Sequence, residues 1–345
     1  MKIKDYRKML QASMKSKDTE EWLDVYFTRP IGLAFALFWN KLGVHPNAIT
    51  ILSIFLGVAS AFMFYHTDLC HNIAGVLLLM FANFCDSTDG QMARLTGKKT
   101  LIGRMLDGFA GDLWFFAIYV ALSLRMQGQF IPGTNIHWGI AIWVMAIVAG
   151  AFCHSPQSSL ADYYRQIHLF FLKGKEGSEL DNSRQQRAIY ESLPKEKWLD
   201  RIFYYNYTNY CRSQERRTPK FQNFFKLFCD LRSENSHCVP QNEDNEGNLT
   251  PHSSLLTPRI QEEFLSGSRP LMKYTNILTF NVRAITIYVT CLLNIPWVYF
   301  LVEIIVMNLL YIHMHRRHET LCERLTEEIK GDRQKYVNTP KTTEN

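Results

Sequence analysis

Apolar residues in this chain are concentrated in blocks rather than spread evenly along it. Six blocks are long enough to cross a bilayer as helices of about 20 residues each. They lie near residues 48–66, 72–95, 101–125, 135–154, 275–294 and 297–316. A polar and charged region separates the fourth block from the fifth. The pattern predicts an all-α, polytopic membrane protein with six transmembrane helices and a large insertion between helices 4 and 5.

The segments between the blocks differ in charge, and this difference predicts an orientation. The three short segments "HTDLCH", "QGQFIPGTN" and "NIPW" contain no Lys or Arg. Basic residues gather on the other side: Lys2, Lys4, Arg7, Lys8, Lys15, Lys17, Arg29, Lys41, Lys98, Lys99, Arg316 and Arg317. The positive-inside rule then places both termini, the 96–100 turn and the insertion in the cytoplasm of a multi-pass integral membrane protein.

The segment 18–42 has the composition of an amphipathic helix lying in the membrane interface. Asp18, with Glu21 three residues later, is expected to cap its start. Pro30 is expected to begin a second helical piece, because proline is tolerated in the first turn. The aromatic residues that would reach the headgroup layer are Trp22, Phe27, Phe35, Phe38 and Trp39. An ordinary soluble amphipathic helix is the alternative.

These patterns divide the chain into five regions. In order, they are an N-terminal cytoplasmic region with the interfacial helix, helices 1–4, the cytoplasmic insertion, helices 5–6 and a cytoplasmic tail. Their boundaries are 1–47, 48–154, 155–270, 271–318 and 319–345.

Composition refines this picture without changing it. The 345 residues carry a formal net charge of +6. Their mean hydropathy of −0.13 resembles that of a soluble protein only because the insertion lowers it. The eight cysteines are scattered and are expected to be free thiols.

Residues 201–228 mix aromatic residues with Arg and Lys. We favour packing of this stretch within the insertion, and contact with anionic headgroups is the second interpretation. No nucleic-acid partner is expected.

Four aspartates interrupt the second and third apolar blocks: Asp86, Asp89, Asp107 and Asp112. Charged side chains within a membrane span cost free energy, so their presence there suggests a functional site. Three forms of compensation are open: protonation, pairing with Arg94 or Arg104, or a bound cation.

Spacing favours the cation. Asp86 and Asp89 are three residues apart and share a helix face, and Asp107 is expected to face them after the 96–100 turn. The small residues Gly90 and Ala93 leave room for a ligand beside the backbone. Carboxylate oxygens are the ligands that Mg²⁺ and Mn²⁺ prefer. Arg94 is well placed for a phosphate.

The stretch "DSTDGQMARLTGKKTLIGRMLD" resembles the signature of the CDP-alcohol phosphatidyltransferases, D-x2-D-G-x2-A-R-x8-G-x3-D-x3-D. Seven signature positions are matched: Asp86, Asp89, Gly90, Ala93, Arg94, Gly103 and Asp107. The resemblance extends to the interfacial helix, the "LGVHPNAIT" opening of the first span and a cytoplasmic site. It does not extend to residues 155–270.

The resemblance implies a role for each matched residue. Two divalent cations, Mg²⁺ or Mn²⁺, would be held by Asp86, Asp89, Asp107 and Asp112. The CDP moiety would contact Gly90, Ala93, Arg94 and Gly103, and Asn47 and Thr50 are expected to reach the same pocket. The partners implied are a CDP-linked lipid or alcohol, a hydroxyl acceptor, the lipid bilayer and, as in many family members, a second copy of the chain.

The sequence departs from the signature at its last aspartate, which should fall at position 111 and is replaced by Gly111. On a regular α-helix Asp112 would point about 100° away from the expected direction. A π-bulge between Gly108 and Gly111 would return Asp112 to the site as the catalytic base, and we favour this interpretation. The alternative leaves Asp112 outside the site and gives its role to another group or to water.

The fifth block carries the candidates for the acceptor side. Arg283 and Asn281 are expected to hold a phosphate-bearing acceptor, such as inositol phosphate or glycerol phosphate; Asn276, Asn308, Glu303 and His154 are weaker candidates. An arginine that extends to the interface without binding substrate is the alternative for Arg283.

The expected reaction is transfer of a phosphatidyl group from CDP-diacylglycerol to the acceptor, with release of CMP. Three alternatives remain: transfer of a head group from CDP-ethanolamine or CDP-choline to diacylglycerol or ceramide, a non-catalytic membrane scaffold, and a transporter that uses the intramembrane carboxylates.

Overall fold

The computed structural model describes residues 6, 9–10, 16, 18–97, 101–236 and 251–338. Its helices up to the start of the insertion are η1 (Asp24–Thr28), α2 (Arg29–Lys41), α3 (Pro46–Phe64), α4 (Leu69–Thr96), α5 (Leu101–Met126), α6 (Gly139–Ile147) and η2 (Val148–His154), and α7 (Ser155–Lys173) is the first helix of the insertion. The insertion holds η3 (Lys175–Gly177), α8 (Ser183–Ser192), α9 (Trp198–Arg217), α10 (Pro219–Ser236) and α11 (Pro251–Ser268). The remaining helices are η4 (Arg269–Leu271), α12 (Met272–Ile277), α13 (Phe280–Leu292), α14 (Trp297–Leu301), η5 (Val302–Met307) and α15 (Asn308–Asn338).

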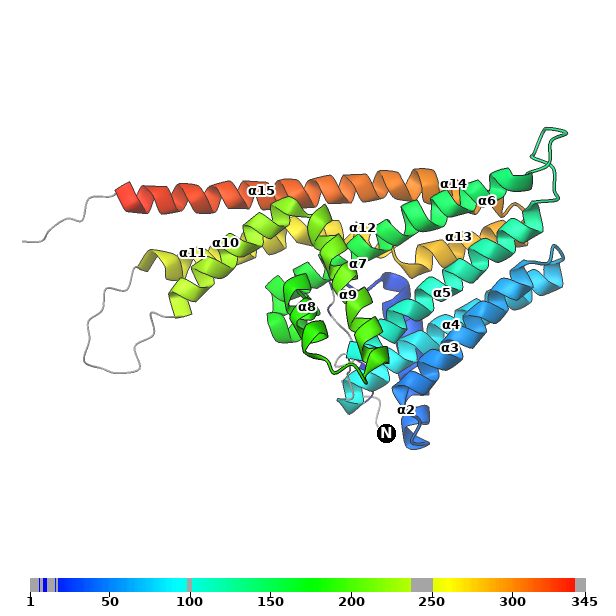
Figure 1. Cartoon of the computed structure of the whole chain (residues 1–345), viewed down its shortest axis with the longest axis horizontal. Helices are drawn as coiled ribbons and strands as arrows, with labels where there is room; N and C mark the ends of the chain where they lie inside the picture. The colour runs from blue at the N-terminus through cyan, green and yellow to red at the C-terminus, as the bar shows by residue number, and fades with distance from the viewer. Residues whose placement is uncertain are drawn as a thin grey trace, which may run out of the picture.

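The prediction of an all-α chain is confirmed within the described residues (Figure 1). Their only extended pairing is a single bridge between Phe130 and His137 in the loop after α5. The basic residues Lys2, Lys4, Arg7, Lys8, Lys15, Lys17, Lys98 and Lys99 and the side chain of Arg104 lie outside the described part of the chain.

Five of the described helices are long and apolar enough to cross a membrane. They are Pro46–Phe64, Leu69–Thr96, Met105–Met126, Gly139–Lys173 and Trp297–Asp332. The predicted span at 275–294 is divided instead: α12 ends at Ile277, and α13 covers only 13 residues. A helix of that length rises about 20 Å, less than the thickness of a hydrocarbon core. The count of six spans therefore stays a prediction.

Two of the long helices continue beyond the membrane-length segment. The fourth predicted span does not end at residue 154 but runs through α6, η2 and α7 to Lys173. The last predicted span continues as α15 to Asn338, so the region predicted as a tail from residue 319 is helical where it is described. Figure 1 shows α15 projecting far from the bundle, with α10 and α11 beside it.

The positions of the π-helical segments differ from the prediction. Helix α5 is α-helical from Leu101 to Met126, so the bulge expected between Gly108 and Gly111 is wrong. The π-helical segments lie instead at η1, η2 and η5, and η2 packs against η5 inside the bundle. Such segments are frequent at functional sites, and these two bring the buried residues His154 and Glu303 together.

Close helix contacts hold the membrane-length bundle together. Helices α3 and α5 approach each other at Gly57, where a Cβ atom would lie only 2.1 Å from Cδ1 of Trp114. Helices α3 and α4 approach at Gly75, where a Cβ atom would lie 2.8 Å from the ring of Phe64. Glycine is required at both positions, because the aromatic rings occupy the space that any side chain would need.

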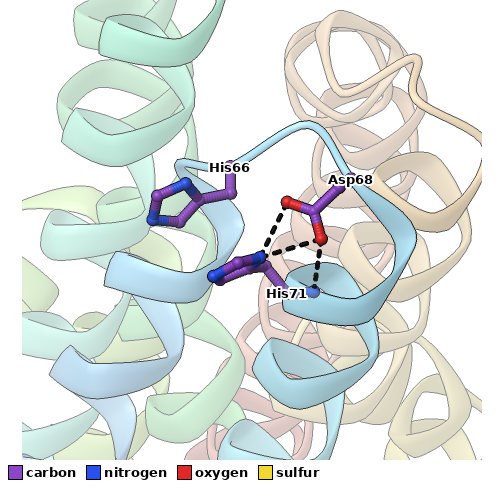
Figure 2. A group of neighbouring side chains, drawn as sticks. All are labelled: His66, Asp68 and His71. Carbon is purple, nitrogen blue, oxygen red and sulfur yellow. Dashed lines mark hydrogen bonds and ion pairs between the residues drawn. The ribbon is translucent and has the colours of Figure 1, made fainter.

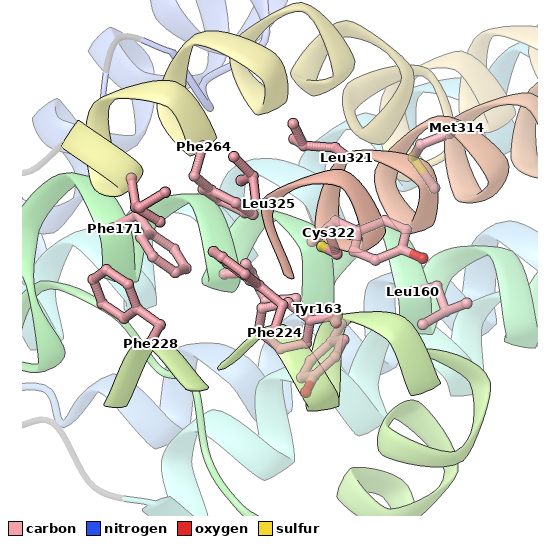
Figure 3. Packing of buried hydrophobic residues seen from close by; sticks show 14 of the residues in the cluster. Leu160, Tyr163, Phe171, Phe224, Phe228, Phe264, Met314, Leu321, Cys322 and Leu325 are labelled. Carbon is pink, nitrogen blue, oxygen red and sulfur yellow. The ribbon is translucent and has the colours of Figure 1, made fainter. Parts of the chain in front are cut away.

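A second apolar core lies outside the bundle, where α7, α10, α11 and α15 meet (Figure 3). The ring of Phe171 stacks on Phe264 with the centroids 4.1 Å apart, and Phe224 stacks on Phe264 at 5.6 Å. Phe224 and Phe228 come from the basic, aromatic stretch, so the packing interpretation is confirmed for these residues. The insertion is thereby attached to the extended ends of two long helices.

The N-terminal segment follows the prediction only in part. Helix α2 begins at Arg29 with Pro30 in its first turn, as expected. Asp18 does not cap a helix; its carboxylate accepts a hydrogen bond from Nε of Arg269 at 3.1 Å. Trp22 and Phe38 are 74% and 55% exposed, as the headgroup interpretation requires.

Candidate active site

Three of the four aspartates come together where the C-terminal part of α4 faces the first turns of α5. Asp86 is close enough to Asp107 to share a hydrogen bond with it, and Asp107 also exerts its charge on Asp89. Asp89 is only 4% exposed, and its Oδ2 accepts a hydrogen bond from Oγ1 of Thr50 on α3. The structure therefore places Thr50 in contact with one of the three clustered carboxylates.

Helix α2 supports this group from the side. A Cβ atom at Gly32 would lie 2.9 Å from Oγ of Ser87, so the backbone of α2 lies directly against α4. Gln91 donates from Nε2 to the backbone oxygen of Arg29 at 3.0 Å and to Oγ of Ser87 at 3.3 Å. Ser87 and Gln91 are the residues between and after the aspartates, so the same turns of α4 that carry the carboxylates also bind the interfacial helix.

Basic residues rim the carboxylates. The guanidinium of Arg94 lies over Gly90, with Nη1 3.4 Å from the position of a Cβ atom there. Arg94 is within electrostatic reach of Arg29, Glu20 and Asp107. Arg29 in turn donates from Nε to Glu20 at 3.1 Å. In the sequence Arg29 is one of several basic residues outside the apolar blocks, and the local pattern does not show that α2 folds back against α4.

The donor set fits a hard divalent cation. The three acidic side chains offer only oxygen ligands, which suits Mg²⁺ or Mn²⁺ better than a metal that prefers nitrogen or sulfur. Like charges this close repel one another, and a bound cation would remove that repulsion. Asp86, Asp89 and Asp107 are therefore the residues that would hold it.

The structure does not bring Asp112 into this group. Because α5 has no bulge, Asp112 lies five regular α-helical positions beyond Asp107, about 140° around the helix. The charge of Asp112 is not among the main electrostatic influences on Asp86 or Asp89. Its charge acts instead on Tyr210 of α9.

Arg283 is buried and fully engaged with other residues of the bundle. It is 1% exposed. It donates from Nε to Glu303 at 2.8 Å, from Nη2 to Gln157 at 2.7 Å, and from Nη1 to the backbone oxygen of Leu278. This arginine therefore does not extend to the interface, and its known partners already use all three nitrogens.

The Arg283 group continues into a buried polar network. His154 lies 3.8 Å from the Glu303 carboxylate and 3.3 Å from the hydroxyl of Tyr119, which also lies 3.1 Å from the hydroxyl of Tyr299. The π-helical segments η2 and η5 supply His154 and Glu303. Sequence periodicity alone did not show that these residues would meet.

Asn281 faces the N-terminal segment rather than an open pocket. Its Nδ2 donates to Glu21 at 2.8 Å and to Asp24 at 3.0 Å, and Thr279 also donates to Glu21. Burial raises the pKa of Glu21, and the charge of Asp24 raises it further. Asn281 thus helps to fasten the interfacial segment to α13.

The other predicted residues lie on α3, α4 and α5, the helices that carry or contact the carboxylates. Asn47 is half-buried in the first turn of α3, one turn before Thr50. Ala93 is half-buried on α4, and Gly103 is half-buried in the first turn of α5. Their contacts with a nucleotide stay predictions.

Comparison with known proteins agrees with the signature. Residues 43–155 match the family model described as CDP-alcohol phosphatidyltransferase. That range includes α3, α4, α5 and all three clustered aspartates, and it ends where the insertion begins.

Three characterised relatives share parts of this chain. An archaetidylinositol phosphate synthase of Pyrococcus horikoshii is 35% identical over 84 residues, which are 24% of this chain and 43% of that protein. A phosphatidylinositol phosphate synthase of Streptomyces avermitilis is 28% identical over 121 residues, 35% of this chain and 48% of that protein. A bifunctional IPC transferase and DIPP synthase of Aquifex aeolicus is 28% identical over 106 residues, 31% of this chain and 22% of that protein. The chain therefore spans less than half the length of each of these relatives.

Proposed function

We propose that this protein transfers a phosphatidyl group from CDP-diacylglycerol to a hydroxyl acceptor and releases CMP, because residues 43–155 match the CDP-alcohol phosphatidyltransferase family model. The observation that carries the proposal is the meeting of Asp86, Asp89 and Asp107 beneath Arg94, in the spacing of the family signature.

The proposed chemistry is substitution at phosphorus. The acceptor oxygen forms a bond to the phosphorus that carries the lipid, the bond from that phosphorus to the CMP oxygen breaks, and the acceptor proton leaves to a base. Asp86, Asp89 and Asp107 would hold divalent cations, Mg²⁺ or Mn²⁺, which neutralise charge on the bridging and leaving oxygens when bound. Arg94 adds a fixed positive charge at the same edge.

The base needs reassignment relative to the family pattern. Asp112 was the expected base, but it lies about 140° around α5 from Asp107 and near Tyr210. We therefore infer that Asp112 does not take the acceptor proton. One of the clustered carboxylates or a water beside them would do so, since a base must lie within hydrogen-bond reach of the proton.

We propose a polyol phosphate as the acceptor, inositol phosphate or glycerol phosphate. The names of two relatives, an archaetidylinositol phosphate synthase and a phosphatidylinositol phosphate synthase, support this choice. The basic rim of Arg29 and Arg94 supports it as well, because guanidinium groups suit phosphate.

Arg283 and Asn281 are less direct candidates for holding this acceptor. The nitrogens of Arg283 already donate to Glu303, Gln157 and Leu278, so we infer that it positions the helices behind the pocket. Arg165 is an additional candidate. Its Nη2 donates to Asn276, whose Nδ2 donates to the backbone of Glu20, and its Nε has no hydrogen-bond partner among the described residues.

We propose that the site and the insertion share the cytoplasmic side of the membrane. The distribution of Lys and Arg between the apolar blocks supports this orientation. Two contacts support placing the insertion and the site at the same end: Arg94 is within electrostatic reach of Glu179, and Asp112 of Tyr210. A homodimer is proposed on family resemblance alone.

The test is a CMP-release screen with the purified full-length chain in Mg²⁺ or Mn²⁺. CDP-diacylglycerol is paired with inositol phosphate, glycerol phosphate, inositol and serine, and CDP-ethanolamine and CDP-choline are paired with diacylglycerol and ceramide. The expected result is CMP release with CDP-diacylglycerol and a polyol phosphate, abolished by Asp89→Asn. Activity only with the second donor set would show that the head-group alternative is correct, and CMP release from no pair would favour a non-catalytic protein.

A further inference from the structure

A second group of potential metal ligands lies at the far end of α4 from the aspartates. His66, Asp68 and His71 each offer a ligand atom, and these three atoms lie within 4.8 Å of one another (Figure 2). His66 and Asp68 belong to the turn between α3 and α4, and His71 belongs to the first turn of α4. Fifteen residues of helix separate His71 from Asp86, a rise of about 22 Å. This group is therefore independent of the proposed active site.

The local geometry brings the three ligand atoms close together. The Asp68 carboxylate lies 2.7 Å from Nδ1 of His71. The imidazole rings of His66 and His71 lie nearly over one another, with the centroids 4.2 Å apart and the planes tilted by 32°. In Figure 2 the His71 ring lies between the His66 ring and the Asp68 carboxylate, and the dashed lines join Asp68 and His71. The turn is exposed at Asp68, so an ion can enter from solvent.

A buried network holds the backbone of this turn. Asn72 donates from Nδ2 to the backbone oxygens of Asp68 at 2.6 Å and of His66 at 3.2 Å. Arg125 on α5 donates from Nη1 to Oδ1 of Asn72 at 2.8 Å and to the backbone oxygen of Phe64 at 2.9 Å. The ligand-bearing residues are thus attached to a fixed backbone, which lowers the ordering cost of binding.

We propose that His66, Asp68 and His71 bind a divalent transition-metal ion, with Zn²⁺ or Cu²⁺ as the matching chemistry. Two imidazoles and one carboxylate form a set that suits these ions and does not suit Mg²⁺, which prefers oxygen ligands. Three protein ligands leave at least one position for water. The protein would then carry two sites of different selectivity, an oxygen site among the aspartates and a nitrogen–oxygen site at the α3–α4 turn.

Helix capping explains part of this arrangement, and the test must separate the two roles. Asp68 is the N-cap of α4, where its carboxylate accepts from the backbone N–H of His71 at 3.1 Å. Capping gives no reason for the position of the His66 ring. Asparagine caps helices as well as aspartate does, so Asp68→Asn keeps the cap and removes the charged ligand.

The experiment uses the purified full-length chain without a polyhistidine tag, freed of metal with a chelator and kept in excess Mg²⁺ to occupy the aspartate site. Zn²⁺ binding is measured by competition with a chromophoric chelator. Cu²⁺ binding is followed by electron paramagnetic resonance, which detects splitting from imidazole nitrogens. The variants are His66→Gln, His71→Gln and Asp68→Asn, and Asp89→Asn is the control at the other site.

The wild type is expected to bind one more equivalent of Zn²⁺ than either histidine variant. Loss of outer-shell partners alone weakens metal binding about 10- to 100-fold, so loss of a ligand should weaken it at least tenfold. Asp89→Asn should keep this equivalent and the nitrogen splitting. Equal stoichiometry and affinity in wild type and His71→Gln, or an unchanged copper spectrum, would overturn the proposal. A melting temperature close to wild type in Asp68→Asn shows that any loss of binding there is not unfolding.

Discussion

Two groups of buried charges in this protein follow opposite rules. Around Arg283, each charge has a partner of opposite sign or a hydrogen-bonding neighbour: Glu303 accepts from Arg283 at 2.8 Å, and Gln157 accepts from it at 2.7 Å. Around Asp89, three groups of the same sign lie together, and Asp86 shares a hydrogen bond with Asp107. The Arg283 group pairs opposite charges within the chain, with Oε2 of Glu303 left without a hydrogen-bond partner among the described residues. The aspartate group brings like charges together, and we propose that a cation balances them.

The difference separates structural charge from functional charge. A buried pair of opposite charges fixes how two helices meet, and it offers no unpaired charge to a ligand. A cluster of like charges destabilises the folded chain, and a ligand of opposite charge offsets this repulsion when it binds. By this criterion, we propose that the aspartates form the active site and that Arg283 holds the surrounding helices together.

The largest expected effect tests the aspartate half of this comparison. Asp107→Asn removes one carboxylate from a site that would hold a divalent cation. Loss of about 4 kcal/mol of transition-state stabilisation corresponds to a rate about a thousandfold lower. CMP release should fall by about that factor, while the melting temperature should not fall, because one repulsive charge has gone. Asp230→Asn, at an exposed position on α10, is the matched control; equal rates for the two variants would contradict the assignment.

The next effect tests the Arg283 half. Arg283→Met leaves Glu303 buried without its partner, which typically costs about 3–5 kcal/mol. Unfolding of the purified chain, followed by tryptophan fluorescence, should show that loss. The double variant Arg283→Met/Glu303→Met should lose less than the single one. Arg212→Met, at an exposed position on α9, should change stability by no more than about 0.5 kcal/mol. A stable Arg283→Met protein with a raised KM for the acceptor would instead favour direct phosphate binding.

The same comparison explains which features of the fold and the site the sequence could predict. The aspartate cluster was predictable because its spacing is local: Asp86 and Asp89 share a helix face, and a short turn brings Asp107 back to them. The all-α class and four of the membrane-length segments between 48 and 154 followed from block length in the same way. These features depend on residues that are close in the sequence.

The features that were missed depend on contacts between distant segments. Arg29 reaches the site only because Gly32 lets α2 lie against Ser87. Arg283 of α13 and Glu303 of η5 meet across the turn between α13 and α14, and hydropathy does not show that their side chains pair. The π-bulge was expected in α5 because two glycines flanked the spacing error, but π-helical segments formed at η2 and η5 instead. Local pattern does not contain the packing that decides these outcomes.

A smaller effect is expected at Asp112, the residue on which the family pattern and this helix disagree. Asp112→Asn should lower CMP release by less than about tenfold, because Asp112 lies away from the cluster. Loss of a true general base would cost about 10²- to 10⁴-fold and remove one limb of the pH–rate profile.

The matched variant is Gly111→Asp combined with Asp112→Asn, which restores the family spacing. A Cβ atom at Gly111 has no neighbour within 4 Å, so the new side chain fits. Activity of this double variant at or above the wild-type level would show that position 111 faces the site, and a large loss in Asp112→Asn alone would show that our reassignment of the base is wrong.

The smallest effect concerns Glu21, which lies outside the membrane-length helices and belongs to neither group. Burial and the charge of Asp24 raise its pKa in the folded chain, so the folded state holds this proton more tightly than the unfolded state does. Stability contributed by Glu21 is therefore complete below its ordinary pKa of about 4.3 and is lost as pH rises through the raised value.

Glu21→Gln has no proton to lose, and the hydroxyl of Thr279 can turn to accept from the new amide. The melting temperature of the variant minus that of the wild type should increase from pH 4 upward and level off above the folded pKa. A difference independent of pH would mean that Asn281 and Thr279 hold Glu21 as a stable carboxylate, and the interfacial segment would then be attached by the same kind of pairing that surrounds Arg283.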